Sequence, residues 1–543
     1  MSAFTQFRRG GLLLGILVLV AGCNRHGTPV ERGIREQVLY RSLSADLTDL
    51  DPQLVTGLPG VNVASALFEG LVAEDPVDLH PVPGVAERWD VSPEGTTYTF
   101  HLRSNARWSN GDPLTAEDFV ASVHRELSPE LGASSVSMLF VLKNAGAFAK
   151  DHEGKVRFED VGIKADDAHT LRLTLEHPVA SLLSQLCQPA WFPVPTRVIA
   201  SCGPLAGKNN PWTRPEHFVG NGPFTLTGWE HNRLILVEKS PNYWDAAHVR
   251  LHAIRFIPSA SVDAEERAFR GGQLHITEAL PIARIDAYRQ ANDPALQISP
   301  FLDTYFYRIN VTKPVLNDVR VRRALSLAID RTALVQSVLR GQQQPARSFT
   351  PPGCDPTYDP PAAASDDPEA ARKLLAEAGY PGGKGLPPIE LLINISGNHQ
   401  LIAEAVQAMW RRELGVDVHI VTMEQTAALA QRSLMAYQIL RSDWAADYAN
   451  DPLAFLNVFT SESSDNHTGW KSPAYDALLA HAEREIDGAR RNDDLKRAES
   501  MLLEQAPLIP LYHLTTIRLV HRSVHGWYPT LLDHHPYKAI WLE

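Results

Sequence analysis

The segment from Arg441 to Trp470 has the side chains best suited to binding chemistry, because it sets a carboxylate between aromatic rings near a cation. Asp447 lies between Trp444 and Tyr448, shortly after Arg441. A carboxylate among aromatic side chains is costly to bury unless an opposite charge pairs with it. A free peptide carries that charge at its amino terminus, and Arg441 could meet the carboxylate at the other end. Taken alone, the segment fits better an aspartate that caps a turn beside core aromatics, so the rest of the chain must decide.

The N-terminus predicts export. Arg8 and Arg9 precede an apolar run at residues 10–22. This run of roughly 13 residues is shorter than the about 20 that span a bilayer, and it is typical of a secretory signal. Small residues lead into Cys23, as at a bacterial lipoprotein cleavage site, where the cysteine becomes the lipid-bearing first residue. The alternative is a chance cysteine after an ordinary signal peptide. Residues 24–37 are polar and are predicted to form a tether.

Composition limits the class of protein. The chain has 543 residues and a net charge of -12, which argues against nucleic-acid binding because phosphate contacts need a basic face. About 520 residues follow the predicted signal, without another long apolar run, and two or three domains are expected. Cys187 and Cys202 could form a disulfide across a short loop in an oxidising compartment, whereas Cys354 looks unpaired.

Apolar periodicity predicts alternating strands and helices, most clearly in the second half, which is typical of an α/β protein. Thr115 and Asp118 form an acidic variant of a capping box, and Asp367-Pro368 begins a helix that Gly379 ends. The predicted strands are Val38–Leu43, Tyr98–Leu102, Leu171–Leu175, Leu234–Glu238, Leu391–Ile393 and Val416–Val421. The other predicted helices are Val61–Leu71, Val321–Ile329 and Ile402–Glu413.

The sequence lacks the motifs of common catalytic sites. It has no G-x-S-x-G nucleophile elbow, no H-E-x-x-H zinc motif and no Walker lysine loop. His534 and His535 follow Asp533, but adjacent histidines on a strand point to opposite sides, so we expect a surface tail there and not a metal site. No enzyme activity, cofactor or metal is predicted.

Six stretches together resemble one family, the extracellular solute-binding proteins of peptide and nickel ABC importers, and most closely its oligopeptide-binding branch. They occur in the family's order and cover nearly the whole mature chain, although each is weak by itself. They are Leu67–Leu71, Val82–Trp89, Tyr98–Phe119, Asn221–Trp244, Val319–Asp330 and Asp443–Asp476.

The resemblance implies a periplasmic-binding-protein-like fold with mixed sheets, in which two lobes are joined by a hinge of two crossing strands and close over a ligand. Lobe I would take residues 24–68, 190–298 and 512–543. An additional inserted domain II would take 69–189, and lobe III would take 299–511. The hinge is expected near Phe301–Tyr305.

The resemblance also implies roles for particular residues. Asp447 matches the aspartate of a W-x-x-D-Y pattern that receives the peptide's α-ammonium group. Arg441 and His399 match positions that face the carboxylate of shorter and slightly longer peptides, and a guanidinium suits that task; a solvent-facing loop histidine is an equal alternative for His399. The remaining expected ligand-contacting residues are Trp444, Tyr448, Ala445, Asp443 and Tyr305.

The chain also departs from the family's pattern. Thr56 replaces a second acidic residue near the ligand amine, and Gln425 replaces a pocket tryptophan. Asp303 and Ala445 replace a cysteine pair, so that disulfide is absent. We therefore expect a monomeric, lipid-anchored receptor on the extracytoplasmic side that delivers short oligopeptides to a permease with separate ATPase subunits. A binder of dipeptides, murein peptides or another small solute in the same fold is the alternative.

Overall fold

The structure is a computed structural model that describes residues 27–151, 153–207, 209–259, 261–340, 343–362, 366–395, 397–446 and 451–543. Three predicted functional residues, Cys23, Asp447 and Tyr448, lie outside the described residues, as does the predicted signal segment. Among the helices in these ranges, none combines the length and the apolar character needed to cross a membrane.

A four-stranded mixed sheet organises the first part of the chain, in the order β1 (Val38–Leu43), β10 (Ala253–Pro258), β9 (Leu234–Lys239) and β8 (Phe224–Glu230). β1 and β10 are parallel, and the other neighbours are antiparallel. An apolar cluster that includes Leu39, Leu67 and Trp212 forms the core here. The helices of this part are α1 (Pro29–Glu36), α2 (Gly57–Leu67) and α6 (Thr196–Cys202).

A second, antiparallel sheet lies within residues 86–174, with the order β4 (Ala86–Val91), β5 (Thr97–Leu102), β7 (Thr170–Thr174) and β6 (Ile163–Asp167). It has its own apolar cluster. The capping box predicted at Thr115 is present, because the Asp118 carboxylate accepts the Thr115 N–H at 2.8 Å. The helices here are α3 (Ala116–Glu126), α4 (Ala145–Lys150) and α5 (Leu182–Gln185), and the hairpin β2 (Val72–Glu74)–β3 (Pro81–Pro83) precedes the sheet.

A six-stranded mixed sheet organises the rest, in the order β12 (Gln344–Pro345), β16 (Leu508–Leu519), β11 (Leu296–Ile309), β15 (Ile439–Ala445), β13 (Ile389–Asn394) and β14 (Val418–Met423). Apolar clusters cover both of its faces. Its helices are α9 (Val319–Leu327), α10 (Arg331–Ala333), α11 (Pro368–Glu377), α12 (Gly397–Leu414), α13 (Gln425–Ser433), α14 (Leu453–Leu456), α15 (Pro473–Arg484) and α16 (Gly488–Gln505).

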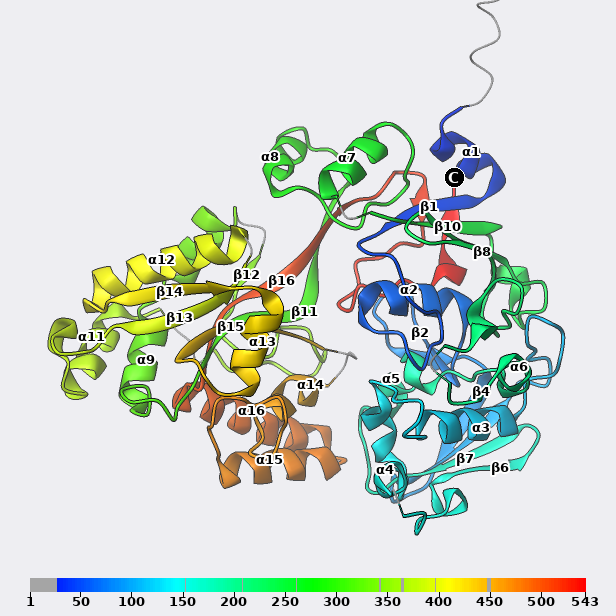
Figure 1. Ribbon diagram of the computed structural model, residues 1–543, viewed down its shortest axis with the longest axis horizontal. Helices are drawn as coiled ribbons and strands as arrows, with labels where there is room; N and C mark the ends of the chain where they lie inside the picture. Colours follow the sequence, from blue (N-terminus) through cyan, green and yellow to red (C-terminus); the bar gives the residue numbers. More distant parts are fainter. Residues whose placement is uncertain are drawn as a thin grey trace, which may run out of the picture.

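Two long strands connect the two halves of the molecule. Figure 1 shows β11 and β16 running side by side between the half that contains β1 and the half that contains β13. Their first pairs lie beside α7 (Val262–Arg270) and α8 (Ile282–Gln290), with which Leu296 and Leu519 share an apolar cluster. Their register shifts between Pro300 and Thr304, within the predicted hinge segment. The predicted division into lobes and an inserted domain stays a prediction.

Two predicted helix boundaries are wrong for local reasons. The helix expected over Val61–Leu71 ends at Leu67, because Phe68 has an extended backbone. The Asn221 side chain then binds the backbone of Glu69: it accepts a hydrogen bond from the Glu69 N–H and donates one to the Glu69 C=O. The helix expected from Ile402 begins earlier, at Gly397, which places His399 in its first turn.

Two predictions about side chains need correction. Cys187, Cys202 and Cys354 are free thiols, so the disulfide considered for Cys187 and Cys202 is not present. Cys187 belongs to the apolar cluster of the second sheet, whereas Cys202 packs against that of the first.

The histidine pair near the C-terminus is not a surface tail. His534 pairs with Glu74 at 2.9 Å, and His535 pairs with Asp533 at 3.0 Å, so the tail is fastened by buried polar contacts. Beyond it, β17 (Val524–His525) and β18 (Trp541–Leu542) form a short ladder. The two rings have different partners, but residues 533–535 do not form the strand that the prediction assumed.

Candidate functional site

The strand β15 leaves one edge open at the point where the predicted ligand-contacting residues lie. Its parallel neighbour β13 pairs with it only at Ile439 and Leu440. From Arg441 to Ala445, within the described part of the chain, the ladder continues only on the β11 side. An unpaired strand edge presents a row of free N–H and C=O groups that can receive another strand.

The hydrogen-bonding pattern shows which residues present these groups. Ala446 N–H donates to Leu302 C=O at 2.9 Å, which makes this a hydrogen-bonded pair across β15 and β11. Such pairs alternate along antiparallel strands, so the even-numbered residues of β15 direct their backbone groups toward β11. Arg441, Asp443 and Ala445 therefore direct theirs toward the open edge.

The side chains of Arg441 and Asp443 form an ion pair on one face of this edge. Arg441 Nη2 lies 2.8 Å from Asp443 Oδ2, with the Arg441 side chain 12% and the Asp443 side chain 44% exposed. The Arg441 guanidinium carbon lies 4.7 Å from the centre of the Tyr305 ring, a cation–π geometry. Burial works to lower the pKa of Arg441, but the Asp443 carboxylate and the Tyr305 hydroxyl outweigh it and raise that pKa.

Tyr305 connects three elements of the site. Its ring stacks on Tyr512 of β16 with centroids 4.7 Å apart, and its hydroxyl lies 3.3 Å from Nδ1 of His399 in α12. Burial, together with the nearby Arg441 charge, lowers the pKa of His399 to about 4. His399 is therefore neutral at neutral pH and can donate or accept a hydrogen bond without adding charge.

Asp303 is an unpredicted member of the site. It lies directly opposite Ala445 in the ladder, on the same face as Asp443, and is 7% exposed. Its Oδ1 atom has no hydrogen-bond partner among the described residues. Burial and the Asp443 charge raise the pKa of Asp303 to about 7, against the opposing effect of Arg441. The sequence offered two signals, the alternation of Asp303 with Tyr305 and Tyr307 along one strand and the resemblance that pairs position 303 with Ala445 as replacements for two cysteines.

Trp444 points to the other face of β15. It lies opposite Thr304, packs partly against the cluster of α14–α16, and donates its indole N–H to Ala454 C=O at 2.8 Å. The structure thus brings Arg441, Asp443, Tyr305 and His399 together at the open edge. Ala445 lies on the same face, and Asp447 and Tyr448 follow beyond the described strand.

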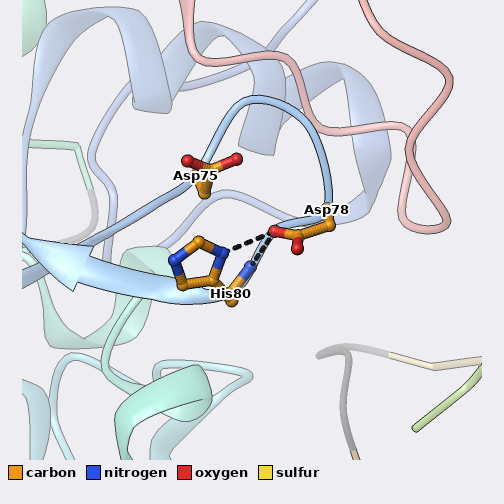
Figure 2. Close-up of side chains that lie close together, drawn as sticks. All are labelled: Asp75, Asp78 and His80. Carbon is orange, nitrogen blue, oxygen red and sulfur yellow. Dashed lines mark hydrogen bonds and ion pairs between the residues drawn. The ribbon is translucent and has the colours of Figure 1, made fainter. Parts of the chain in front are cut away.

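A second polar group occurs at the turn of the β2–β3 hairpin, where Figure 2 shows Asp78 turned toward His80. His80 Nδ1 lies 2.6 Å from Asp78 Oδ1, and Asp75 Oδ1 accepts the Val77 N–H at 2.8 Å. These contacts fold the turn, which inserts Leu79 into the apolar cluster beside the six-stranded sheet. The polar side chains are explained by the turn itself.

A cavity lies between this hairpin and the C-terminal tail, and its charged groups are already satisfied. Glu69 accepts from the Tyr243 hydroxyl and from the Trp244 indole N–H, each at 2.5 Å, and Glu74 pairs with His534. The cavity therefore offers fewer free polar groups than the open edge of β15.

Comparison with known proteins establishes the class. A family model for bacterial extracellular solute-binding proteins, family 5 (middle), matches residues 80–467. The chain belongs to this family of transport binding proteins, which are not enzymes, and the predicted family is confirmed.

Particular relatives cover almost all of the chain. It is 36% identical over 536 residues to the periplasmic oligopeptide-binding protein OppA of Escherichia coli (strain K12), with 96% of each chain covered. It is also 36% identical over 530 residues to the probable deoxycholate-binding periplasmic protein YgiS of the same strain, again with 96% of each covered. The open, unliganded structure of MppA, a periplasmic murein tripeptide-binding protein, matches with a TM-score of 0.79 and 34% identity, covering 93% of this chain and 97% of that one. The predicted two-lobed α/β fold with mixed sheets is confirmed.

Proposed function

We propose that this protein is the lipid-anchored substrate-binding component of an ABC importer that captures short oligopeptides. The observation that carries the proposal is the open edge of β15, where Arg441, Asp443 and Ala445 present their backbone groups. A peptide added as a strand gains main-chain hydrogen bonds that do not depend on its sequence, while side-chain pockets supply selectivity.

The peptide lies antiparallel to β15 in this proposal. Its α-ammonium group binds Asp447, and its C-terminus extends toward Arg441 and His399. Truncating one member of such a desolvated ion pair costs about 2–5 kcal/mol. Because side chains alternate along a strand, successive ligand residues face the Arg441 side and the Trp444 side in turn. Trp444 and Tyr448 then line pockets for alternate side chains.

Closure of the lobes completes the site. We propose lobe I at residues 24–68, 190–298 and 512–543, domain II at 69–189, lobe III at 299–511, and bending of β11 and β16 near the register shift at Pro300–Thr304. Burying both charged ends of a peptide stabilises the closed form, so the unliganded protein is mostly open.

The proposed location is the periplasm or cell envelope, where OppA, YgiS and MppA are named as periplasmic proteins. Lipid attached to Cys23 holds the monomer at the membrane, next to a permease powered by separate ATPases. Mass spectrometry of the exported protein, with and without Cys23→Ala, tests the anchor; a mature chain with an unmodified Asn24 start would refute it.

Calorimetry with tri- to pentapeptides tests the cargo. Peptides with a free amine should bind, whereas N-acetylated peptides and the variant Asp447→Asn should bind at least about 30-fold more weakly. Asp417→Asn is a matched control, because it removes an aspartate from an exposed ion pair of the same half. Equal affinity for blocked peptides would contradict the role of Asp447. Binding of a bile acid and no peptide would favour the second candidate, another small solute, which the similarity to YgiS supports.

A further inference from the structure

The open edge of β15 has more negative than positive charge on the face that Arg441 shares with Tyr305. One guanidinium, Arg441, faces two carboxylates, Asp443 and Asp303, and His399 contributes no charge at neutral pH. The aromatic rings of Tyr305 and Tyr512 stack on each other, and the Arg441 guanidinium lies over the Tyr305 ring. This balance bears on what kind of ligand group the face can accept.

Arg441 is paired with a carboxylate of the protein, although its buried Nε lacks a hydrogen-bond partner among the described residues, so a peptide C-terminus that reaches it meets a partly occupied guanidinium. Its Nη2 already donates to Asp443 Oδ2 at 2.8 Å, so an incoming carboxylate must first displace Asp443 or share the guanidinium with it. Two carboxylates on one cation repel each other, and this repulsion is strong in a partly desolvated site. A ligand cation, in contrast, is attracted to Asp443, because the second oxygen of this carboxylate is not used by Arg441 and the side chain is half exposed.

Asp303 extends the negative face inward. Ala445, directly opposite in the ladder, has only a methyl side chain, the smallest that a chiral residue can place beside the Asp303 carboxyl group. Asp303 Oδ1 is buried and lacks a hydrogen-bond partner among the described residues. An unpaired buried oxygen of this kind is stabilised by a donor that arrives with a ligand.

We infer that this face selects peptides with a basic side chain, whose ammonium or guanidinium group binds between Asp443 and Asp303. The inference rests on the proposed function, because the side chain must be delivered by a peptide strand at the β15 edge. In such a strand the residues directly opposite Asp443 and Ala445 point their side chains to this face.

Binding of the cation also releases protons. Asp303 is partly protonated near neutral pH, because its pKa is about 7, and a neighbouring cation favours its ionised form. The charged or titratable groups that face it are Asp443 and Arg441 from β15 and Tyr512 from β16. The affinity for basic peptides should therefore fall as the pH drops below about 7.

Calorimetry with tetra-alanine peptides that carry one lysine or one methionine at each of positions 2 to 4 tests the inference. We expect lysine to bind about tenfold tighter than methionine at one position or at two alternate positions. Asp443→Asn and Asp303→Asn should each lower this ratio several-fold, whereas Asp443→Glu should retain most of it. Titrations in buffers of different ionisation enthalpy should show proton release with the lysine peptide, and Asp303→Asn should abolish it.

Asp417→Asn is the matched control, and circular dichroism verifies that each variant is folded. Amine-dependent binding without a lysine preference, or a preference that both substitutions leave intact, would overturn the inference while the proposed function stands. If no tetrapeptide with a free amine binds, the proposed function fails and the inference fails with it.

Discussion

Two arginine–aspartate pairs in this molecule have similar geometry and different surroundings. Arg125 Nη2 lies 2.6 Å from Asp51 Oδ2, and Arg441 Nη2 lies 2.8 Å from Asp443 Oδ2. The first pair is 0% and 2% exposed, and its carboxylate also accepts from the Trp212 indole. The second pair stands at an open strand edge.

The difference shows that a short ion-pair distance does not define a role. The Asp51 carboxylate accepts hydrogen bonds from several protein donors. It connects the loop that precedes α2 with Arg125, which belongs to α3. The Asp443 carboxylate uses one oxygen for Arg441 and offers the rest to solvent or ligand. We therefore assign the first pair to stability and the second to binding, and substitutions should separate them.

The largest effect is expected for Asp51→Ala. It leaves the buried Arg125 guanidinium without its carboxylate partner, with only the Gln53 side chain and the Leu205 C=O to accept from it, which costs about 3–5 kcal/mol. Thermal and urea denaturation should show this loss in the part of the molecule that contains α2 and α3. A loss below about 1 kcal/mol would contradict the structural role of this pair.

Asp303→Asn should stabilise the protein at alkaline pH. The pKa of Asp303 is raised to about 7 in the folded state, so folding favours the protonated acid. The stability it contributes is full below the ordinary pKa of an aspartate and is lost as the pH rises to about 7. As the pH rises from 4 to 8, the free energy of unfolding of the variant should increase by up to about 4 kcal/mol relative to that of the natural chain. Urea denaturation across this range measures it, and a constant difference would refute the shift.

These predictions also show what the sequence could and could not reveal. Local signals specified local structure: Thr115 and Asp118 cap α3, and Asp367 accepts the Ala370 N–H at the start of α11. The extended backbone at Phe68 depends on Asn221, a residue distant in sequence, so helical periodicity ran past the true end of α2.

The candidate site shows the same limit: the sequence pointed to residues, but not to their contacts with residues distant in sequence. The resemblance pointed to Arg441 and His399, but their contact with Tyr305 arises from the order of strands and helices in the six-stranded sheet. The resemblance paired Asp303 with Ala445 as replacements for two cysteines, but only the ladder showed that Asp303 lies on the same face as Asp443. Strand pairing of this kind cannot be read from periodicity, which gives the face of a residue but not its neighbour.

A smaller effect on stability is expected for Asp443→Asn. Because the Asp443 side chain is 44% exposed, the free energy of unfolding should fall by less than about 1 kcal/mol, even though peptide selectivity changes. Denaturation of the unliganded variant measures this. A loss as large as that of Asp51→Ala would mean that the pair holds the fold together.

The smallest effect is expected for Asp417→Asn, which removes the partner of Arg411 at 3.0 Å on the surface. Stability should change by less than about 0.5 kcal/mol, and the change should vanish in high salt. A larger, salt-resistant change in denaturation experiments would contradict the idea that the stability contributed by the Asp51, Asp443 and Asp417 ion pairs decreases as their exposure increases.

The central claim is that a peptide adds as a strand to the open edge of β15. Hydrogen–deuterium exchange with mass spectrometry, in the presence and absence of a bound tetrapeptide, tests it most directly. We predict that peptide slows amide exchange in the segment 439–446, while α3 and the Asp51 loop change little. Unchanged exchange over 439–446 on a saturated protein would contradict the claim.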